Sequence, residues 1–235
     1  MLIVKLLLDA WCKPNKMTLR ISSIIFTLIT IFAFVSNNDT KEKERGISSA
    51  IHSELPDSLL LKVSTNEEDI IFSSYLENRL EPIRENFKRI NSKSHWTSIK
   101  KKELFQSTEG GEATFYFSDN GLEKIIARQF GEGGQNLTEY YLLNGALSFV
   151  FDKSISYNRP IYYDSLAMIE NNDNQYFDLK MSEFVEERFY FERGKLIHII
   201  NDLDCGAPME EGFLKKEEQR VAAKFDLILK SLNDN

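Results

Sequence analysis

The stretch TFYFSDNGLEKII occupies residues 114–126 and decides the fold, because it places an Asn-Gly turn between an aromatic run and an apolar run. Both positions of such a turn need a positive φ, which asparagine and glycine tolerate, so the stretch predicts a β-hairpin. Two later stretches follow the same scheme, YYLLNGALSFVF at residues 140–151 and FYFERGKLIHII at residues 189–200. Together the three stretches predict an antiparallel meander of hairpins.

The spacing of the turn glycines points to one more hairpin. Gly121, Gly145 and Gly194 are 24 and 49 residues apart, and the second gap is close to twice the first. A degenerate hairpin is therefore expected to turn near residues 171–174, with strands at 160–163 and 176–179. The three stretches resemble MORN-type hairpin repeats, which also place a glycine turn between an aromatic strand and a leucine-bearing strand. The resemblance implies hairpins and no function, because the other regularly spaced glycines of such repeats are missing.

Two glycine clusters, at residues 109–112 and 131–134, favour hairpin or bulge turns. A phosphate-binding loop would lead into the start of a helix, whereas both clusters lead into stretches that predict strands. The short apolar run at residues 59–63 favours one more short strand.

Two amphipathic helices are predicted to flank the strands. The first begins at Thr65, which precedes Glu67 and Glu68 in a capping-box arrangement. Its apolar residues recur every three or four positions and are Phe72, Leu76, Leu80, Ile83, Phe87 and Ile90. Pro82 predicts a kink or a split after Leu80. The second helix covers residues 210–232, where Leu214, Val221, Phe225, Ile228 and Leu232 have the same spacing.

These elements predict a single α+β domain over residues 58–235. Its antiparallel hairpin meander, of six to eight strands, would pack against an N-terminal and a C-terminal amphipathic helix. We expect the meander to present one apolar face, which the helices cover.

An apolar run, ISSIIFTLITIFAFV at residues 21–35, follows Lys16 and Arg20. As a helix it would reach only about 23 Å, less than the roughly 30 Å of a bilayer core, so it favours a signal peptide over a membrane span. An uncleaved signal anchor stays open, because residues 33–36 offer no clean cleavage site. Translation from Met17 is a further alternative, and residues 1–16 would then not be translated.

The predicted organisation is therefore a signal peptide or signal anchor at residues 1–36 and a polar linker at residues 37–57. The protein is expected to be extracytoplasmic, either secreted or periplasmic, or anchored by its N-terminal segment. It would touch the membrane only through residues 19–36, and only if the signal is not cleaved.

The charge of the chain excludes some partners. Its 29 basic and 36 acidic residues give a net charge of −7, and removal of residues 1–36 leaves 25 basic and 35 acidic residues, or −10. Such an acidic domain is a poor ligand for nucleic acid. The same removal leaves Cys205 as the only thiol, either a small buried hydrophobe or a reactive group.

Catalytic motifs are absent from the sequence, and no residue pattern predicts a metal or a cofactor. A catalytic candidate combines His198 with Asp202, Asp204 and Cys205, because an imidazole oriented by a carboxylate can activate a thiol. The alternative is a strand histidine followed by an Asp-rich turn. Four tyrosines, Tyr140, Tyr162, Tyr163 and Tyr190, are weak candidates for a binding groove, although core packing explains them equally well.

The sequence therefore favours a non-enzymatic domain that binds an envelope protein, a glycan or a peptide through its sheet. One alternative is a carrier, in which a curved sheet encloses a small amphiphile or lipid. Another is a hydrolase with its site near His198, Asp202 and Asp204.

Overall fold

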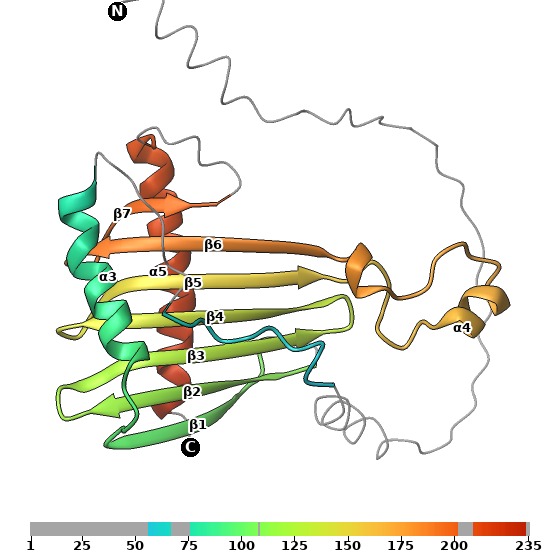
Figure 1. Cartoon of the computed structure of the whole chain (residues 1–235), viewed down its shortest axis with the longest axis horizontal. Coiled ribbons are helices and arrows are strands. Elements are labelled where there is room, and N and C mark those ends of the chain that lie inside the picture. Colours follow the sequence, from blue (N-terminus) through green and yellow to red (C-terminus); the bar gives the residue numbers. More distant parts are fainter. Residues whose placement is uncertain (1–55, 67–75, 108, 202–208, 234–235) are drawn as a thin grey trace, which may run out of the picture. The chain divides into compact units, whose positions relative to one another are not determined.

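The computed structural model describes residues 56–66, 76–107, 109–201 and 209–233, which all belong to one compact unit that begins at Gly46. Seven strands form one antiparallel sheet in chain order (Figure 1). They are β1 (Ser98–Leu104), β2 (Gly111–Ser118), β3 (Gly121–Gly131), β4 (Gly134–Leu143), β5 (Ala146–Ser156), β6 (Glu183–Glu192) and β7 (Lys195–Ile200). The predicted antiparallel sheet and α+β class are confirmed, and seven strands lie within the predicted six to eight.

The three hairpins read from the turn glycines are β2–β3, β4–β5 and β6–β7. In the second hairpin Asn144 has φ 53° and Gly145 has φ 79°, and in the third Arg193 and Gly194 have the same two values. Positive φ at both turn positions matches the right-handed twist of the strands that they join. In the first hairpin Gly121 has φ 96° but Asn120 has no positive φ, so the expected turn conformation is wrong there, although all three hairpins form where they were predicted.

The fourth hairpin was predicted in the wrong place. The chain between β5 and β6 forms no strand but contains a short helix, α4 (Ser165–Glu170), and a 3₁₀ turn, η1 (Leu179–Met181). Asp164 accepts hydrogen bonds from the backbone N–H groups of Leu166 and Ala167 and so caps α4. These hydrogen bonds favour the start of a helix over the pairing of a strand. The additional hairpin is instead β3–β4, which turns at the glycine cluster of residues 131–134.

The sheet is covered on both faces, not on one as expected. Helix α3 (Glu77–Asn91) lies over one face and α5 (Glu211–Asn233) over the other (Figure 1). The α3 core comprises Leu76, Leu80, Ile83, Phe87, Ile90, Tyr141, Phe149, Phe151 and Tyr190. The α5 core includes Phe115, Ile125, Tyr140, Val150, Phe189, Phe191, Ile199, Val221 and Ile228. Neighbouring strand residues such as Tyr140 and Tyr141 are therefore both buried.

Helix α3 runs without interruption through Pro82, so the predicted split after Leu80 is wrong. Pro82 lies close to the helix start and removes only one N–H donor, while Leu80 and Ile83 on either side of it are buried in the α3 core. The predicted helix start at Thr65 cannot be compared, because residues 67–75 lie outside the described residues.

Each of the three glycine-turn hairpins contains a β-bulge, and its extra residue has no partner across the ladder. These residues are Glu123 in β3, Ser148 in β5 and Ile197 in β7. Glu123 accepts hydrogen bonds from Arg89 of α3 and from Lys93, which follows the end of α3. Ile197 packs against the α3 core. Because a bulge re-aims a side chain, two of the bulges help to hold α3 on the sheet.

The Glu123 bulge predicts a pH dependence of stability. Burial alone would raise the pKa of this carboxyl group, but the hydrogen bonds from Lys93 and Arg89 outweigh burial and lower the pKa. A folded-state pKa below the unfolded one means that the unfolded chain binds the proton first as the pH falls. We expect Glu123→Gln to be less stable than the wild type in urea titrations at pH 7, and the difference to shrink towards pH 3. A difference that does not change with pH would contradict this assignment.

The N-terminal predictions are mostly outside the described residues. Residues 1–36 and all but the last two residues of the predicted linker are not described. Within the part of the chain that the structure describes, no helix is long and apolar enough to cross a membrane. Residues 59–63 form no strand, so that prediction is wrong, because their backbone groups bond to side chains of the sheet instead of joining a ladder.

Candidate functional site

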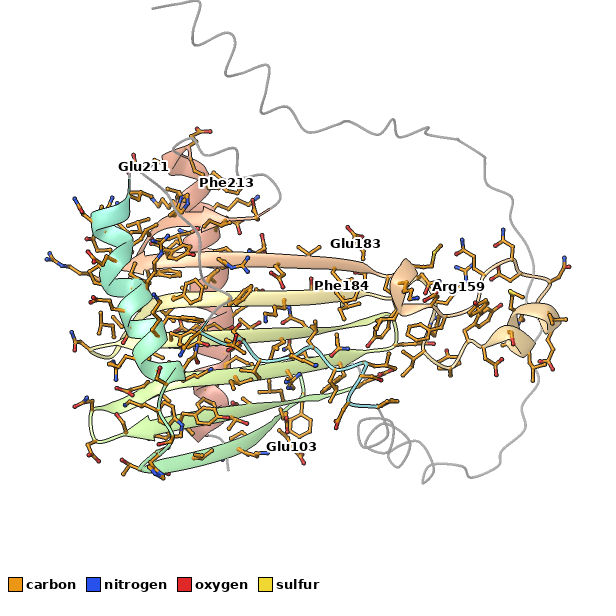
Figure 2. The ribbon with its side chains drawn as sticks, in the orientation of Figure 1. Glu103, Arg159, Glu183, Phe184, Glu211 and Phe213 are labelled. Carbon is orange, nitrogen blue, oxygen red and sulfur yellow. The ribbon has the colours of Figure 1, made fainter. Side chains whose placement is uncertain are left out.

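The segment between β5 and β6, residues 157–182, is here called the excursion. It leaves the end of the sheet that lies away from α3 and carries α4 at its tip (Figure 1). Figure 2 labels Arg159 at the start of the excursion and Glu183 and Phe184 at the start of β6. The root of the excursion is fixed where Tyr157 donates its backbone N–H to the Gly133 carbonyl at 2.8 Å.

The excursion folds on itself. The rings of Tyr157 and Phe177 meet edge to face at 5.5 Å, and the Phe177 backbone N–H donates to the Tyr163 carbonyl at 2.7 Å. Arg159 and Asp173 form an ion pair at 2.9 Å. These contacts give the excursion a defined conformation, which lowers the entropy lost when such a surface binds a partner.

Exposed hydrophobic side chains are concentrated in and beside the excursion. Of the ten large hydrophobic residues that are exposed among the described residues, six lie between residues 162 and 184. They are Tyr162, Leu166, Ile169, Tyr176, Met181 and Phe184. Leu166 and Ile169, which are 67% and 68% exposed, lie three positions apart and so share one face of α4, a helix that buries none of its residues. Exposed apolar side chains gathered in this way mark a surface for interaction.

The excursion and the first residue of β6 carry more acidic than basic residues. Residues 157–183 contain five acidic and two basic residues. Arg159 is already paired with Asp173, while Glu170, Glu183 and Lys180 are exposed. The exposed apolar side chains therefore belong to a segment with a net negative charge.

The four candidate tyrosines have different environments. Tyr140 lies in the α5 core and Tyr190 in the α3 core, and neither reaches the surface. Tyr163 is half-buried and donates its hydroxyl to Asp173 at 3.3 Å. Tyr162 is 64% exposed and donates its hydroxyl to Glu132 of the β3–β4 turn, a hydrogen bond that raises the pKa of Tyr162. Only Tyr162 thus belongs to an exposed apolar surface.

Leu166, Ile169 and Met181 are not among the residues that were predicted from the sequence to bind a partner. The signal was present, because these apolar residues lie in a stretch rich in asparagine and aspartate, and they fit the period of neither a buried strand nor a long helix. Unpaired apolar residues of this kind are candidates for contact with a partner.

Of the four catalytic candidates, only His198 lies among the described residues. His198 is 2% exposed and packs beside the Tyr190 ring, with 5.9 Å between ring centroids. Asp202, Asp204 and Cys205 lie outside the described residues, so the hydrolase hypothesis stays a prediction. Among the residues that are described, no three His, Cys, Asp or Glu side chains are close enough to hold a metal ion.

A groove of about 500 Å³ lies between α3 and the turns of the β4–β5 and β6–β7 hairpins. Its walls include Ile83, Leu147 and Phe191, and its border includes the Arg79–Glu192 ion pair at 2.6 Å. This volume lies within the roughly 300–1,000 Å³ of small-molecule sites. The carrier hypothesis stays a prediction, to be tested by mass spectrometry of lipids that co-purify with the protein.

A scan against protein-family models and searches of curated proteins and of solved structures find no match for the chain. The function therefore has to be argued from the geometry and chemistry of its surfaces. The excursion is the described surface whose composition differs most clearly from an ordinary solvated one.

Proposed function

We propose that the protein is a non-catalytic binding module that uses the excursion to dock onto another protein. The observation that carries this proposal is the concentration of exposed apolar side chains on a segment that folds on its own contacts. The sheet supports the excursion, and α3 and α5 stabilise the sheet at a distance from the contact.

The chemistry of the excursion favours a protein over a glycan or an amphiphile. Half of the six exposed side chains, Leu166, Ile169 and Met181, are not aromatic. Such side chains bury well in an apolar protein groove, whereas sugar recognition relies on aromatic rings and hydrogen bonds. The net negative charge of the excursion favours a partner whose groove is bordered by lysine or arginine, because complementary charge speeds and orients association. The partner class is thus a protein with an apolar groove and a basic border.

The location belongs to the same proposal. The apolar run at residues 21–35 supports export, so the partner would be a protein of the cell envelope or of the surroundings. A retained signal anchor would hold the module at the membrane, and the linker of residues 37–57 would let it reach its partner.

The proposal is tested with purified protein bearing Leu166→Asp and Ile169→Asp together. Envelope proteins that the wild-type chain retains are identified by mass spectrometry, purified and titrated against both chains. We expect the double variant to bind the partner at least about 10-fold more weakly, because central apolar contacts are worth more than about 1 kcal/mol each.

The matched control is Ile99→Asp, which charges an exposed isoleucine on β1, a strand distant from the excursion. It should leave the affinity unchanged. Equal affinity of the wild-type chain and the double variant for every recovered protein would overturn the proposal, and a glycan or lipid displaced by the double substitution would reassign the partner class.

A further inference from the structure

Residues 59–64, here called the strap, lie across the face of the sheet that α3 also covers (Figure 1). The strap belongs to no strand ladder. Its backbone polar groups must therefore be satisfied by other partners, and side chains of β3, β4 and β5 provide them.

Three long polar side chains bind the main chain of the strap. Gln135 accepts the Leu61 N–H at 3.1 Å and donates to the Leu59 carbonyl at 2.6 Å. Arg128 donates to the Leu61 carbonyl at 2.6 Å, and Lys153 donates to the Lys62 carbonyl at 3.1 Å. All four hydrogen bonds go to backbone atoms, so they would hold any extended peptide in this position, whatever its side chains.

A fourth side chain, Glu139, selects for a hydroxyl group. Glu139 is fully buried, and one of its oxygens accepts both the Ser64 N–H and the Ser64 hydroxyl, each at 2.7 Å. Its other oxygen accepts the Tyr141 hydroxyl at 2.7 Å and lies 3.2 Å from the Lys124 ammonium. Because Tyr141 and Lys124 fix the carboxylate, an incoming peptide meets a preorganised acceptor that suits serine or threonine.

We infer that this face also accepts the strap of a second copy of the chain, whose Ser64 would occupy the position at Glu139. Two copies that exchange straps would form a symmetric pair. This use of the β3–β5 face is independent of the partner proposed for the excursion.

A second copy is the occupant favoured by the structure, because the strap is the one peptide that it shows in the site. An exchanged strap would make the same hydrogen bonds as the strap of its own chain, so the exchange costs little beyond the entropy of association.

The test uses the full chain, prepared with and without ¹⁵N label, and a synthetic peptide of residues 56–66. Native mass spectrometry of the mixed preparations should detect dimers that contain one labelled and one unlabelled copy. Excess peptide should convert these dimers into monomers that carry one peptide. The Ser64→Ala peptide should compete about 10-fold more weakly, because it lacks a hydrogen bond to a buried carboxylate. The Ser58→Ala peptide, changed at an exposed position, should compete like the original.

A chain with Ser64→Pro, or with Leu61→Pro, loses a strap N–H donor and should bind the peptide more tightly than the wild type does. The inference would be overturned if no mixed dimers form, or if excess peptide does not dissociate them. Equal competition by the two alanine peptides would also overturn it. Failure of both proline variants to fold would also overturn it, because a segment without which the domain cannot fold is not exchangeable.

Discussion

A Gly134→Ala chain should be less stable than the wild type by about 3 kcal/mol, with a midpoint of thermal unfolding about 6–12 °C lower. A Cβ atom at this position would lie 2.1 Å from the Ile155 carbonyl oxygen, a distance at which the backbone of β4 or β5 must move. Gly134 pairs with Ser156, the last residue of β5 before the excursion, so the distortion falls at the root of the proposed binding surface.

The neighbouring glycine gives a matched control. A Cβ atom on Gly133 would meet no atom within 4 Å, and Gly133 is not among the glycines with positive φ. Gly133→Ala should therefore change the free energy of unfolding by less than about 0.5 kcal/mol. Urea titrations monitored by circular dichroism measure both variants. Equal stability of the two alanine variants would show that the strands separate at this point without cost.

The sequence was informative wherever the deciding chemistry is local. The Asn144-Gly145 turn requires only that two consecutive residues accept positive φ, and the structure has both. The C-terminal helix could be read from its own apolar period, and α5 buries Val221 and Ile228 as that period predicts. The prediction of a fourth hairpin at residues 171–174 was wrong because it rested only on the spacing of the turn glycines. The local structure there depends instead on Asp164, which caps α4.

The strap could not be predicted because its partners are distant in the sequence and are not backbone atoms. Residues 59–63 have the apolar composition of a strand, but Leu61 bonds to side chains 67 and 74 residues away. Tyr140 and Tyr162 look equally suited to binding in the sequence, yet the two-sided covering of the sheet buries Tyr140 and leaves Tyr162 exposed. Strands with only one buried face alternate apolar and polar residues. The adjacent tyrosines at 140 and 141 break that alternation, and this was the sign in the sequence that the sheet is covered on both faces.

The largest loss of stability is expected at the buried ion pair of Lys124 and Glu139. The two side chains are 7% and 0% exposed and lie 3.2 Å apart, so Glu139→Ala leaves the Lys124 ammonium in the protein interior without its carboxylate. It also removes the acceptor of the Tyr141 hydroxyl and of Ser64. Removal of one partner of a buried ion pair costs about 3–5 kcal/mol, which urea titration at pH 7 would measure.

A double variant separates the cost of an unpaired charge from the cost of lost packing. Lys124→Met with Glu139→Leu removes both charges and should recover part of the stability lost by Glu139→Ala. Burial already lowers the pKa of Lys124 in the wild type, although Glu139 opposes this effect. Without Glu139 the pKa of Lys124 should fall further, so the unfolded chain binds more protons than the folded one between the two pKa values. The stability of Glu139→Ala relative to the double variant should therefore rise with pH, up to the ordinary pKa of lysine near about 10.4. A relative stability that stays constant over this range would mean that water reaches Lys124 once the carboxylate is gone.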